Sequence, residues 1–232
     1  MFSVRNFALP IARAAFRPQV AGTSVSRAFA TSQILRAPAL TEAVTSDHRD
    51  LEKYYKIIVN SKDADEQERY GNQFTWELAR HSVAEELIVY PAMERYMGEA
   101  GKDHAEKDRK QHHQLKEDLK IFQNMKVDNP QYLPQLKKLH EHLEHHIKEE
   151  ESDDLPALEK ALASEQNKGS SESVAKTFSR TKMFVPSRSH PAAGENPYIE
   201  GPGGLPVAIF DHIADLFRKF PDGTISPNPS QK

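Results

Sequence analysis

The chain has 232 residues, of which 38% are hydrophobic and 28% charged, and its formal net charge is -3. This length and apolar fraction suit one folded domain with tails and argue against a fully disordered chain. No run approaches the ~18 consecutive apolar residues of a membrane-spanning helix. The lack of cysteine excludes disulfides and thiolate metal sites. The near-neutral charge argues against nucleic acid as the main partner.

The N-terminal stretch has a composition of its own. Residues 1–41 contain five arginines and several serines and alanines, and no acidic residue precedes Glu42. An arginine-rich, serine-containing and acid-poor segment is typical of a mitochondrial transit peptide. We therefore expect residues 1–36 to be a transit peptide, or else a disordered basic tail, and we expect a mitochondrial protein of the matrix.

Helical periodicity dominates residues 40–166. The apolar positions predict helices from about residue 40 to 59, from 65 to 97 and from 103 to 126, with a fourth after the turn at 128–130. Gly98 and Gly101 are expected to end the second helix. Short polar turns between long helices favour antiparallel neighbours. The predicted fold is therefore all-α, an up-down-up-down four-helix bundle.

The composition changes after Asn167. Residues 167–205 are rich in glycine, serine and proline, which predicts an extended and poorly ordered arm. Residues 206–221 form an amphipathic pattern, and we expect a short helix there, followed by a disordered tail over residues 222–232.

The amphipathic segment has one apolar face and one acidic face. Asp211 and Asp215 are predicted on the acidic face, opposite the large apolar side chains. The segment either packs back on the bundle as a fifth element or uses its apolar face to contact a partner or a membrane surface. That face comprises Ile209, Phe210, Ile213, Leu216, Phe217 and Phe220.

The most informative feature is an internal repeat. Residues 81–91 and 146–156 both read H-x-x-x-E-E-x-x-x-x-P, each late in a long predicted helix. A helix with a histidine in its apolar stripe precedes each copy, with His48 before the first and His112 before the second. The chain therefore looks like two αα-hairpins with equivalent polar residues directed inward. Pro91 and Pro156 are expected to bend or end their helices beyond these residues.

Helical phase selects His112 over its neighbour His113. Leu115, Leu119 and Phe122 follow His112 at the offsets at which apolar residues follow His48. The same offsets from His113 give lysine and glutamine, which predicts a solvated face. The equal sequence spacing of 33 residues from His48 to His81 and from His113 to His146 favours the other choice. A loop can absorb one residue whereas a helix cannot, so we choose His112.

Residues four apart on a helix lie on one face, so each H-x-x-x-E pair can present an imidazole and a carboxylate to one interior point. With His48 and His112, the bundle would hold four histidines and two carboxylates, a set that suits two adjacent metal ions. Mixed nitrogen and oxygen ligation with open positions favours iron, or less readily manganese, over closed tetrahedral zinc. The predicted ligands are His48, His81, Glu85, His112, His146 and Glu150.

Other polar residues of the bundle have less defined roles. His142 is a candidate for an extra ligand or for a hydrogen-bond partner of a ligand, because it precedes His146 by four residues. The tyrosines near the ligand helices are either core aromatics or hydrogen-bond donors close to the metals; they are Tyr54, Tyr55 and Tyr90. The remaining histidines of the bundle are expected on the surface; they are His104, His113, His140 and His145.

Four segments, residues 47–51, 81–91, 111–116 and 146–156, resemble the hemerythrin-like HHE cation-binding family. The C-terminal segments, including 187–191, are similar to the tails of fungal members. The resemblance implies a four-helix bundle around a non-haem di-iron centre, with the family's ligands on the same six positions. Oxygen-carrying members have a second histidine four residues from the one in the third helix, whereas this chain has Asp108 and Lys116 there.

This difference favours oxidation chemistry or iron handling over simple reversible oxygen carriage. We expect a di-iron protein that binds a small ligand such as oxygen, nitric oxide or peroxide, or that buffers or senses iron. One alternative is a di-iron oxidase-type enzyme. Another alternative is a metal-free helical interaction module that uses the C-terminal amphipathic segment.

Overall fold

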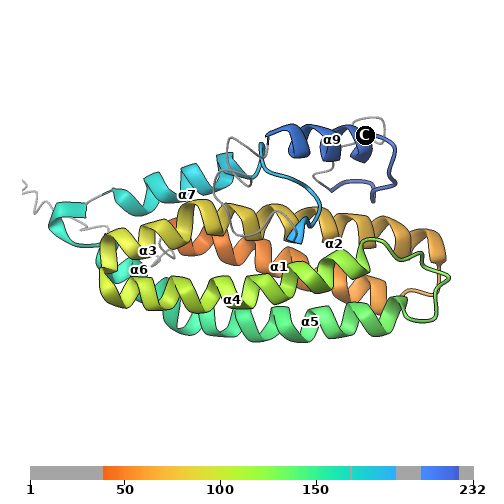
Figure 1. Cartoon of the computed structure of the whole chain (residues 1–232), viewed down its shortest axis with the longest axis horizontal. Coiled ribbons are helices and arrows are strands. Elements are labelled where there is room, and N and C mark those ends of the chain that lie inside the picture. Colours follow the sequence, from red (N-terminus) through yellow and green to blue (C-terminus); the bar gives the residue numbers. More distant parts are fainter. Residues whose placement is uncertain (1–38, 168, 192–204, 225–232) are drawn as a thin grey trace, which may run out of the picture. The chain divides into compact units, whose positions relative to one another are not determined.

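Four long helical rods form the fold of the computed structural model, which describes residues 39–167, 169–191 and 205–224 (Figure 1). The first rod is α1 (Ala39–Asn60) and the second runs through α2 (Ala64–Ala84), η1 (Glu85–Val89) and α3 (Tyr90–Met97). The third rod is α4 (Glu99–Phe122), and the fourth runs through α5 (Tyr132–Glu149), η2 (Glu150–Asp154) and α6 (Leu155–Leu162). A short 3-10 turn, η3 (Glu165–Asn167), follows.

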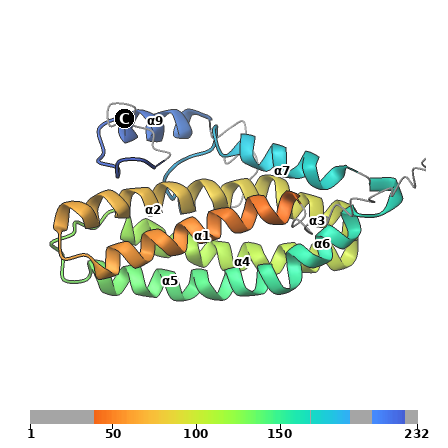
Figure 2. The same cartoon turned by 180° about the vertical axis from the view of Figure 1, so that it is seen from behind.

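Short connections make consecutive rods antiparallel, and both views show them side by side (Figures 1 and 2). The predicted all-α bundle is therefore confirmed, and no strand occurs in the described part of the chain. No helix among those residues is both long and apolar enough to cross a lipid bilayer. The expected transit peptide, residues 1–36, lies outside the described residues.

The hairpin between α3 and α4 is tighter than the sequence suggested. Gly98 has a φ of 67°, a left-handed conformation that favours glycine, and α4 begins directly after it rather than at about residue 103. Gly101 lies inside α4, where a Cβ would stand 2.0 Å from the carbonyl oxygen of Met93. Gly101 therefore permits the close approach of the two helices and does not end one of them.

The two rods that carry the repeated motif contain matching π-helical segments. In η1 the backbone N–H of Tyr90 donates to the carbonyl of Glu85, and in η2 the N–H of Leu155 donates to that of Glu150. Pro91 and Pro156 then lie in the first turn of α3 and α6, where a missing N–H costs little. Each proline thus follows a widened turn and begins a new α-helix within the same rod.

Two apolar clusters fill the bundle, one on each side of a polar layer. One cluster includes Leu40 and Val44 of α1 together with Leu155 of α6. The other includes Leu51 of α1 together with Leu139 of α5. Along α1, α2–η1, α4 and α5–η2 the residues between these clusters are the histidines and glutamates of the repeat. Burial of the clusters holds the four rods together and fixes the polar layer between them.

The arm differs from the expected extended segment, because residues 170–181 form a helix, α7 (Ser170–Thr181). Its buried face is small, but Phe178 is fully buried in the same cluster as Leu40. Lys182, directly after the helix, places its Nζ 2.6 Å from Asp47 Oδ1 on α1. These tertiary contacts, rather than helix propensity, order the first part of the arm.

The amphipathic helix α9 (Leu205–Asp215) is shorter than the expected 206–221, because turns begin at Leu216. It is also inverted, since Asp211 and Asp215 are buried while its large apolar side chains are exposed. Asp215 accepts a hydrogen bond from the Ser187 hydroxyl at 2.5 Å, and Asp211 lies 2.9 Å from His190 Nε2. Contacts to the preceding segment therefore decide which face points inward.

The large apolar side chains on the outward face of α9 and of the turn that follows it have exposed fractions from 49% to 85%. Phe220, which the sequence grouped with this face, lies beyond α9 and is buried. Contact with a partner or a membrane surface through the exposed side chains stays a prediction. Those exposed side chains are Ile209, Phe210, Ile213, Leu216 and Phe217.

Candidate metal centre

All six predicted ligands meet in the polar layer, where each is at most 1% exposed. His48 comes from α1, His81 and Glu85 from α2–η1, His112 from α4, and the last two from α5–η2; these are His146 and Glu150. Each rod therefore contributes at least one polar side chain to a single buried site. Helical phase decides this arrangement, as His113 next to His112 is exposed.

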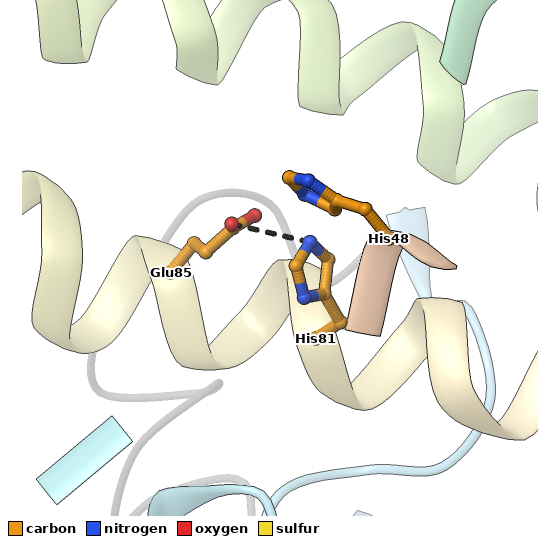
Figure 3. Close-up of side chains that lie close together, drawn as sticks. All are labelled: His48, His81 and Glu85. Atoms are coloured by element: carbon orange, nitrogen blue, oxygen red, sulfur yellow. Dashed lines mark ion pairs between the residues drawn. The ribbon is translucent and has the colours of Figure 1, made fainter. Parts of the chain in front are cut away.

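Glu85 lies between two pairs of imidazoles. Its Oε1 is 3.1 Å from Nε2 of His81, and its Oε2 is 3.3 Å from Nε2 of His112. Figure 3 shows Glu85, His81 and His48 converging from α1 and α2–η1. Ligand atoms of these three residues lie within 4.8 Å of one another, and so do those of Glu85 with His112 and His146. One carboxylate is thus shared by two groups of three potential ligands.

Glu150 occupies the corresponding place in the second hairpin. Its Oε2 is 3.3 Å from Nε2 of His48 and 4.0 Å from Nε2 of His146. The two glutamates therefore each face one imidazole of their own hairpin and one of the other. Nε2 of His112 and Nε2 of His146 are 3.1 Å apart, too close for both nitrogens to carry protons facing each other.

The Nδ1 atoms of the histidines point away from this centre, and each has an acceptor. The second glutamate of each E-E pair reaches across to the other hairpin. Glu151 Oε1 is 2.8 Å from Nδ1 of His48, and Glu86 Oε1 is 3.0 Å from Nδ1 of His112. Such acceptors fix the ring orientation and leave Nε2 free to bind a metal.

In each hairpin, the residue before the first histidine is the acceptor for Nδ1 of the second histidine. Asp47 Oδ2 is 3.1 Å from Nδ1 of His81, and Gln111 Oε1 is 2.9 Å from Nδ1 of His146. Helical periodicity in the sequence did not identify any of these four acceptors. The doubled glutamate of the repeat and the polar residue before each histidine were the available signals.

Glu85 carries a negative charge in the metal-free protein. Burial alone would raise its pKa, but His81 and His112 hold it well below the ordinary value. In turn, burial lowers the pKa of His81, yet Glu85 and Asp47 outweigh it and raise the value to about 10. Burial also opposes the charge on His112, but Glu85 and Glu86 raise its pKa to about 9. Protons on these imidazoles thus balance the carboxylates.

Glu150 and His146 of the second hairpin have the opposite tendency from Glu85 and His81. Burial and repulsion from Glu85 raise the pKa of Glu150 to about 7. Burial and the nearby His112 lower the pKa of His146 well below its ordinary value. A neutral imidazole is the form that binds metal, so His146 is ready to do so. The two halves of the centre therefore differ in charge although their residues correspond.

The donor set fits metal cations. Nε2 of His48 and of His81 and all four carboxylate oxygens of Glu85 and Glu150 are buried with no hydrogen bond of ordinary geometry, and only ion pairs among the ligands themselves compensate them. Buried polar atoms without partners are costly and rare in folded proteins. Cations bound between them would satisfy these atoms and replace the protons on the imidazoles. Imidazole nitrogen with carboxylate oxygen is a donor set typical of iron and manganese.

One of the three tyrosines reaches the centre. The Tyr90 hydroxyl is 2.9 Å from Nε2 of His112, and the ring is fully buried. Tyr54 packs in the apolar cluster with Leu51, while Tyr55 stacks on His140 with ring centroids 3.5 Å apart. Tyr90 is therefore placed to interact with a ligand at the centre, whereas the other two are structural aromatics.

The remaining histidines of the bundle lie away from the centre. His142 Nδ1 is 2.7 Å from Asp118 Oδ2 and belongs to neither group of potential ligands, so it is not placed as an extra ligand. His140 was expected on the surface but is buried, because it stacks on Tyr55 and pairs with Glu52. His104 is half-buried beside Asp154, while His145 is exposed as expected.

Comparisons with known proteins agree with this geometry. Residues 39–158 match the Hemerythrin HHE cation binding domain family. The chain is 46% identical over 182 residues to a hemerythrin-like protein of Schizosaccharomyces pombe, covering 78% of this chain and 88% of that protein. It is also 23% identical over 149 residues to a DNA nickase of Nostoc, covering 64% of this chain and 40% of that protein.

A solved structure shares the fold. The crystal structure of a hemerythrin HHE cation binding domain-containing protein from Mycobacterium kansasii matches with a TM-score of 0.52 at 18% sequence identity. The match covers 71% of this chain and 95% of that one. Together with the family match and the relative in Schizosaccharomyces pombe, the buried histidine and glutamate layer leads to one conclusion. This chain belongs to the hemerythrin HHE cation-binding family.

Proposed function

We propose that the chain is a non-haem di-iron protein that binds a small ligand, such as oxygen, nitric oxide or peroxide, at open positions of its centre. The supporting observation is the sharing of Glu85 by two groups of three potential ligands. Glu150 faces imidazoles of both groups, so it would be a second carboxylate able to hold both metals. The four histidines, once neutral, and the two glutamates would hold two irons and would leave positions for a small ligand.

The chain's own residues supply the surroundings of such a ligand. An iron pair, when bound, supplies the electrons and the open coordination positions. The buried layer excludes water, since all six donor side chains are at most 1% exposed. Burial and nearby carboxylates, first Glu85, raise the pKa of Tyr90 well above its ordinary value. Its hydroxyl therefore keeps its proton and can donate a hydrogen bond beside His112.

Metal content tests the proposal. Purified anaerobically with ferrous iron, the full chain should hold about two irons, as expected for a two-metal site. The double variant His81→Ala, His146→Ala should lose them, because each group of ligands loses an imidazole. A control double variant, His113→Ala with His145→Ala, removes two exposed imidazoles from α4 and α5 and should keep its iron. Equal iron content in the two double variants contradicts the proposal.

Ligand binding tests the second part. Nitric oxide added anaerobically to the ferrous protein should change its absorption spectrum in proportion to the bound iron. Tyr90→Phe should keep the iron content and weaken this binding, because the hydroxyl near His112 is lost. Repeated turnover of an added reductant with oxygen would instead identify an oxidase-type enzyme. This enzyme is the second candidate, because the buried phenol of Tyr90 lies at the centre.

The arginine-rich first 41 residues support a location in the mitochondrial matrix. Import of the full chain into isolated mitochondria should depend on the membrane potential and should yield a shortened, protease-protected product. Replacing Arg5, Arg13 and Arg17 by alanine should abolish import. Import that survives this change contradicts the proposed location.

A further inference from the structure

A cation must cross protein to reach the centre, because none of its six donor side chains is more than 1% exposed. The second hairpin offers polar side chains in the direction of the surface. On α4, His104, Asp108 and His112 follow one another at intervals of four residues, so they lie on one face of the helix. Asp154 follows Glu150 by four residues on the facing rod. Metal-binding side chains thus continue outward from the centre in two steps.

Asp108 forms the inner step and has no compensating partner. It is 0% exposed, and neither of its carboxylate oxygens has a hydrogen-bond partner. The pKa of Asp108 is raised to about 8, first by burial and then by repulsion from Asp154 and Glu150, which together outweigh the opposite effect of His112. A buried carboxyl group without a partner is destabilising unless something positive or a proton joins it.

Asp154 pairs with His104, which lies one helical turn before Asp108 on α4, and so continues the polar side chains to the surface. It is also 0% exposed, and its Oδ2 has no hydrogen-bond partner, while its Oδ1 pairs with His104 Nδ1. The His104 side chain is 32% exposed and stands at the rim. Imidazole and carboxylate are the same two kinds of donor that make up the centre.

A surface pocket of ≈ 470 Å³ opens at this rim. Its lining contains three carboxylates and one ammonium group. That ammonium group, on Lys107, is paired with Glu149 at 3.1 Å. A concave surface with a net negative charge raises the local concentration of cations. The lining residues are Asp103, His104, Lys107, Ser152, Asp153 and Asp154.

We propose that His104, Asp154 and Asp108 form a path along which divalent metal cations pass from this pocket to Glu150 and His112 of the centre. The inference rests on the proposed metal centre and adds how that centre is loaded. The residues act as exchanging donors: a cation leaves the pocket, contacts Asp154 and Asp108 in turn, and arrives at the buried ligands. They hold no cation permanently, because the described residues form only two groups of three or more potential ligands, and both groups lie at the centre.

The test measures how fast cobalt(II) enters the metal-free full chain. Cobalt(II) is added anaerobically in a stopped-flow instrument, loading is followed by visible absorption, and the final metal content is measured by elemental analysis. Asp108→Asn and Asp154→Asn should each slow loading by about tenfold or more, since negative charge in a cleft changes on-rates by this order. The final content should equal that of the unchanged chain.

Asp153→Asn is the matched control. It removes one negative charge from the same pocket, but Asp153 is exposed, so its effect on the rate should stay within about twofold because solvent screens it. His104→Ala is a further variant at the half-exposed rim, where the fold is not at risk, and it should also slow loading. Because a path does not alter the equilibrium, release of cobalt to a chelator should slow by the same factor.

The outcomes separate this inference from the proposed function. Loading of Asp108→Asn, Asp154→Asn and His104→Ala at the unchanged rate, with about two cobalt ions in every chain, overturns the path and leaves the centre standing. Loss of one cobalt ion in Asp108→Asn also overturns it, because Asp108 would then be a permanent ligand. Failure of the unchanged chain to bind cobalt or iron overturns both proposals.

Discussion

The two hairpins build the centre from corresponding residues in different surroundings. His48, His81 and Glu85 of the first correspond to His112, His146 and Glu150 of the second. The acceptors correspond as well, except that Asp47 of the first hairpin is replaced by Gln111 in the second. The first half lies under α7, where the ring of Phe178 contacts that of His81 edge to face, with ring centroids 5.9 Å apart. The second half lies next to Asp108, Asp154 and an open pocket.

This difference shows that a repeated motif does not produce two equivalent metal positions. The carboxylate of Asp47 is held by Lys182 at 2.5 Å and supports a charged His81. The side-chain amide of Gln111 donates a hydrogen bond to Glu149 at 2.5 Å. Because this amide is neutral, it does not favour a charged His146. We therefore expect the first half to be the more closed and rigid, and the second to be the side from which metal arrives.

The largest expected effect follows from the position of Glu85 in both ligand groups. Glu85→Gln should remove both metals, from about two per chain to none, because each metal loses a charged donor. Glu150→Gln should keep at least part of the metal, since the distance of 4.0 Å from Glu150 to His146 is longer than the other three ion-pair distances between these histidines and glutamates. Elemental analysis after gel filtration measures the content. Equal losses in the two variants would mean that the hairpins are equivalent.

The packing of α7 over the first half of the centre should contribute strongly to the free energy of unfolding. Phe178→Ala should lower the free energy of unfolding by about 3–5 kcal/mol, because a fully buried aromatic ring leaves a cavity. Phe184→Ala, a few residues further on, removes a ring that is 63% exposed and should stay within about 0.5 kcal/mol of the unchanged chain. Urea denaturation of the metal-free proteins measures both values. Similar values for the two variants would contradict the packing of α7 on the bundle.

Asp47 and Gln111, the acceptors that differ between the two halves, should contribute unequally to metal affinity. Asp47→Ala should weaken binding by about 10–100-fold, the usual cost of losing an acceptor that orients a ligand histidine. Gln111→Ala should weaken binding less, because a neutral amide adds less to the basicity of His146. Competition with a calibrated chelator measures the affinities. The double exchange Asp47→Gln, Gln111→Asp moves the charged acceptor to the second half. In that background, loss of the acceptor at position 111 should weaken metal binding more than loss of the acceptor at position 47.

The pH dependence is a more gradual effect and concerns the metal-free protein. The pKa of His81 is about 10 and that of His112 about 9 when folded, against 6.5 ordinarily, so the folded chain keeps these protons longer. Their contribution to stability is complete below pH 6.5 and is lost as the pH rises through 9 and 10. Asp108, with a pKa of about 8, acts in the same direction.

We therefore expect the free energy of unfolding of the metal-free chain to fall between pH 6.5 and 9. Urea denaturation at several pH values measures this fall. The iron-loaded chain is the control and should not show it, because cations have replaced the protons. A metal-free chain whose stability rises over this range would mean that the buried histidines are neutral.

Much of the bundle and the ligand set follows from sequence periodicity. The histidine and glutamate of each repeat are four residues apart, and a helix leaves little choice about where they point. The same argument separates buried His112 from exposed His113. The acceptors could not be derived in this way, because Glu86 and Glu151 each bind a histidine of the other hairpin, and their partners depend on how the rods are rotated against each other.

The C-terminal segments were harder to predict for a different reason. Composition described residues 167–205 as an arm, but the burial of one ring, Phe178, orders α7. In α9 the amphipathic pattern was recognised, yet it gave no information on which face is covered. The backbone N–H of Arg188 donates to Asp211, and the His190 imidazole lies against the same carboxylate, so polar contacts within the same part of the chain set the orientation.

The π-helical turns at Glu85–Val89 and Glu150–Asp154 have a consequence for how the layers of the site are arranged. Deleting one residue from such a turn would restore ordinary α geometry and rotate everything after it by about 100°. The histidines would stay in place, whereas Tyr90 would swing away in one rod and Asp154 in the other. A single surplus residue in each rod thus sets the neighbours of the ligands independently of the ligands themselves.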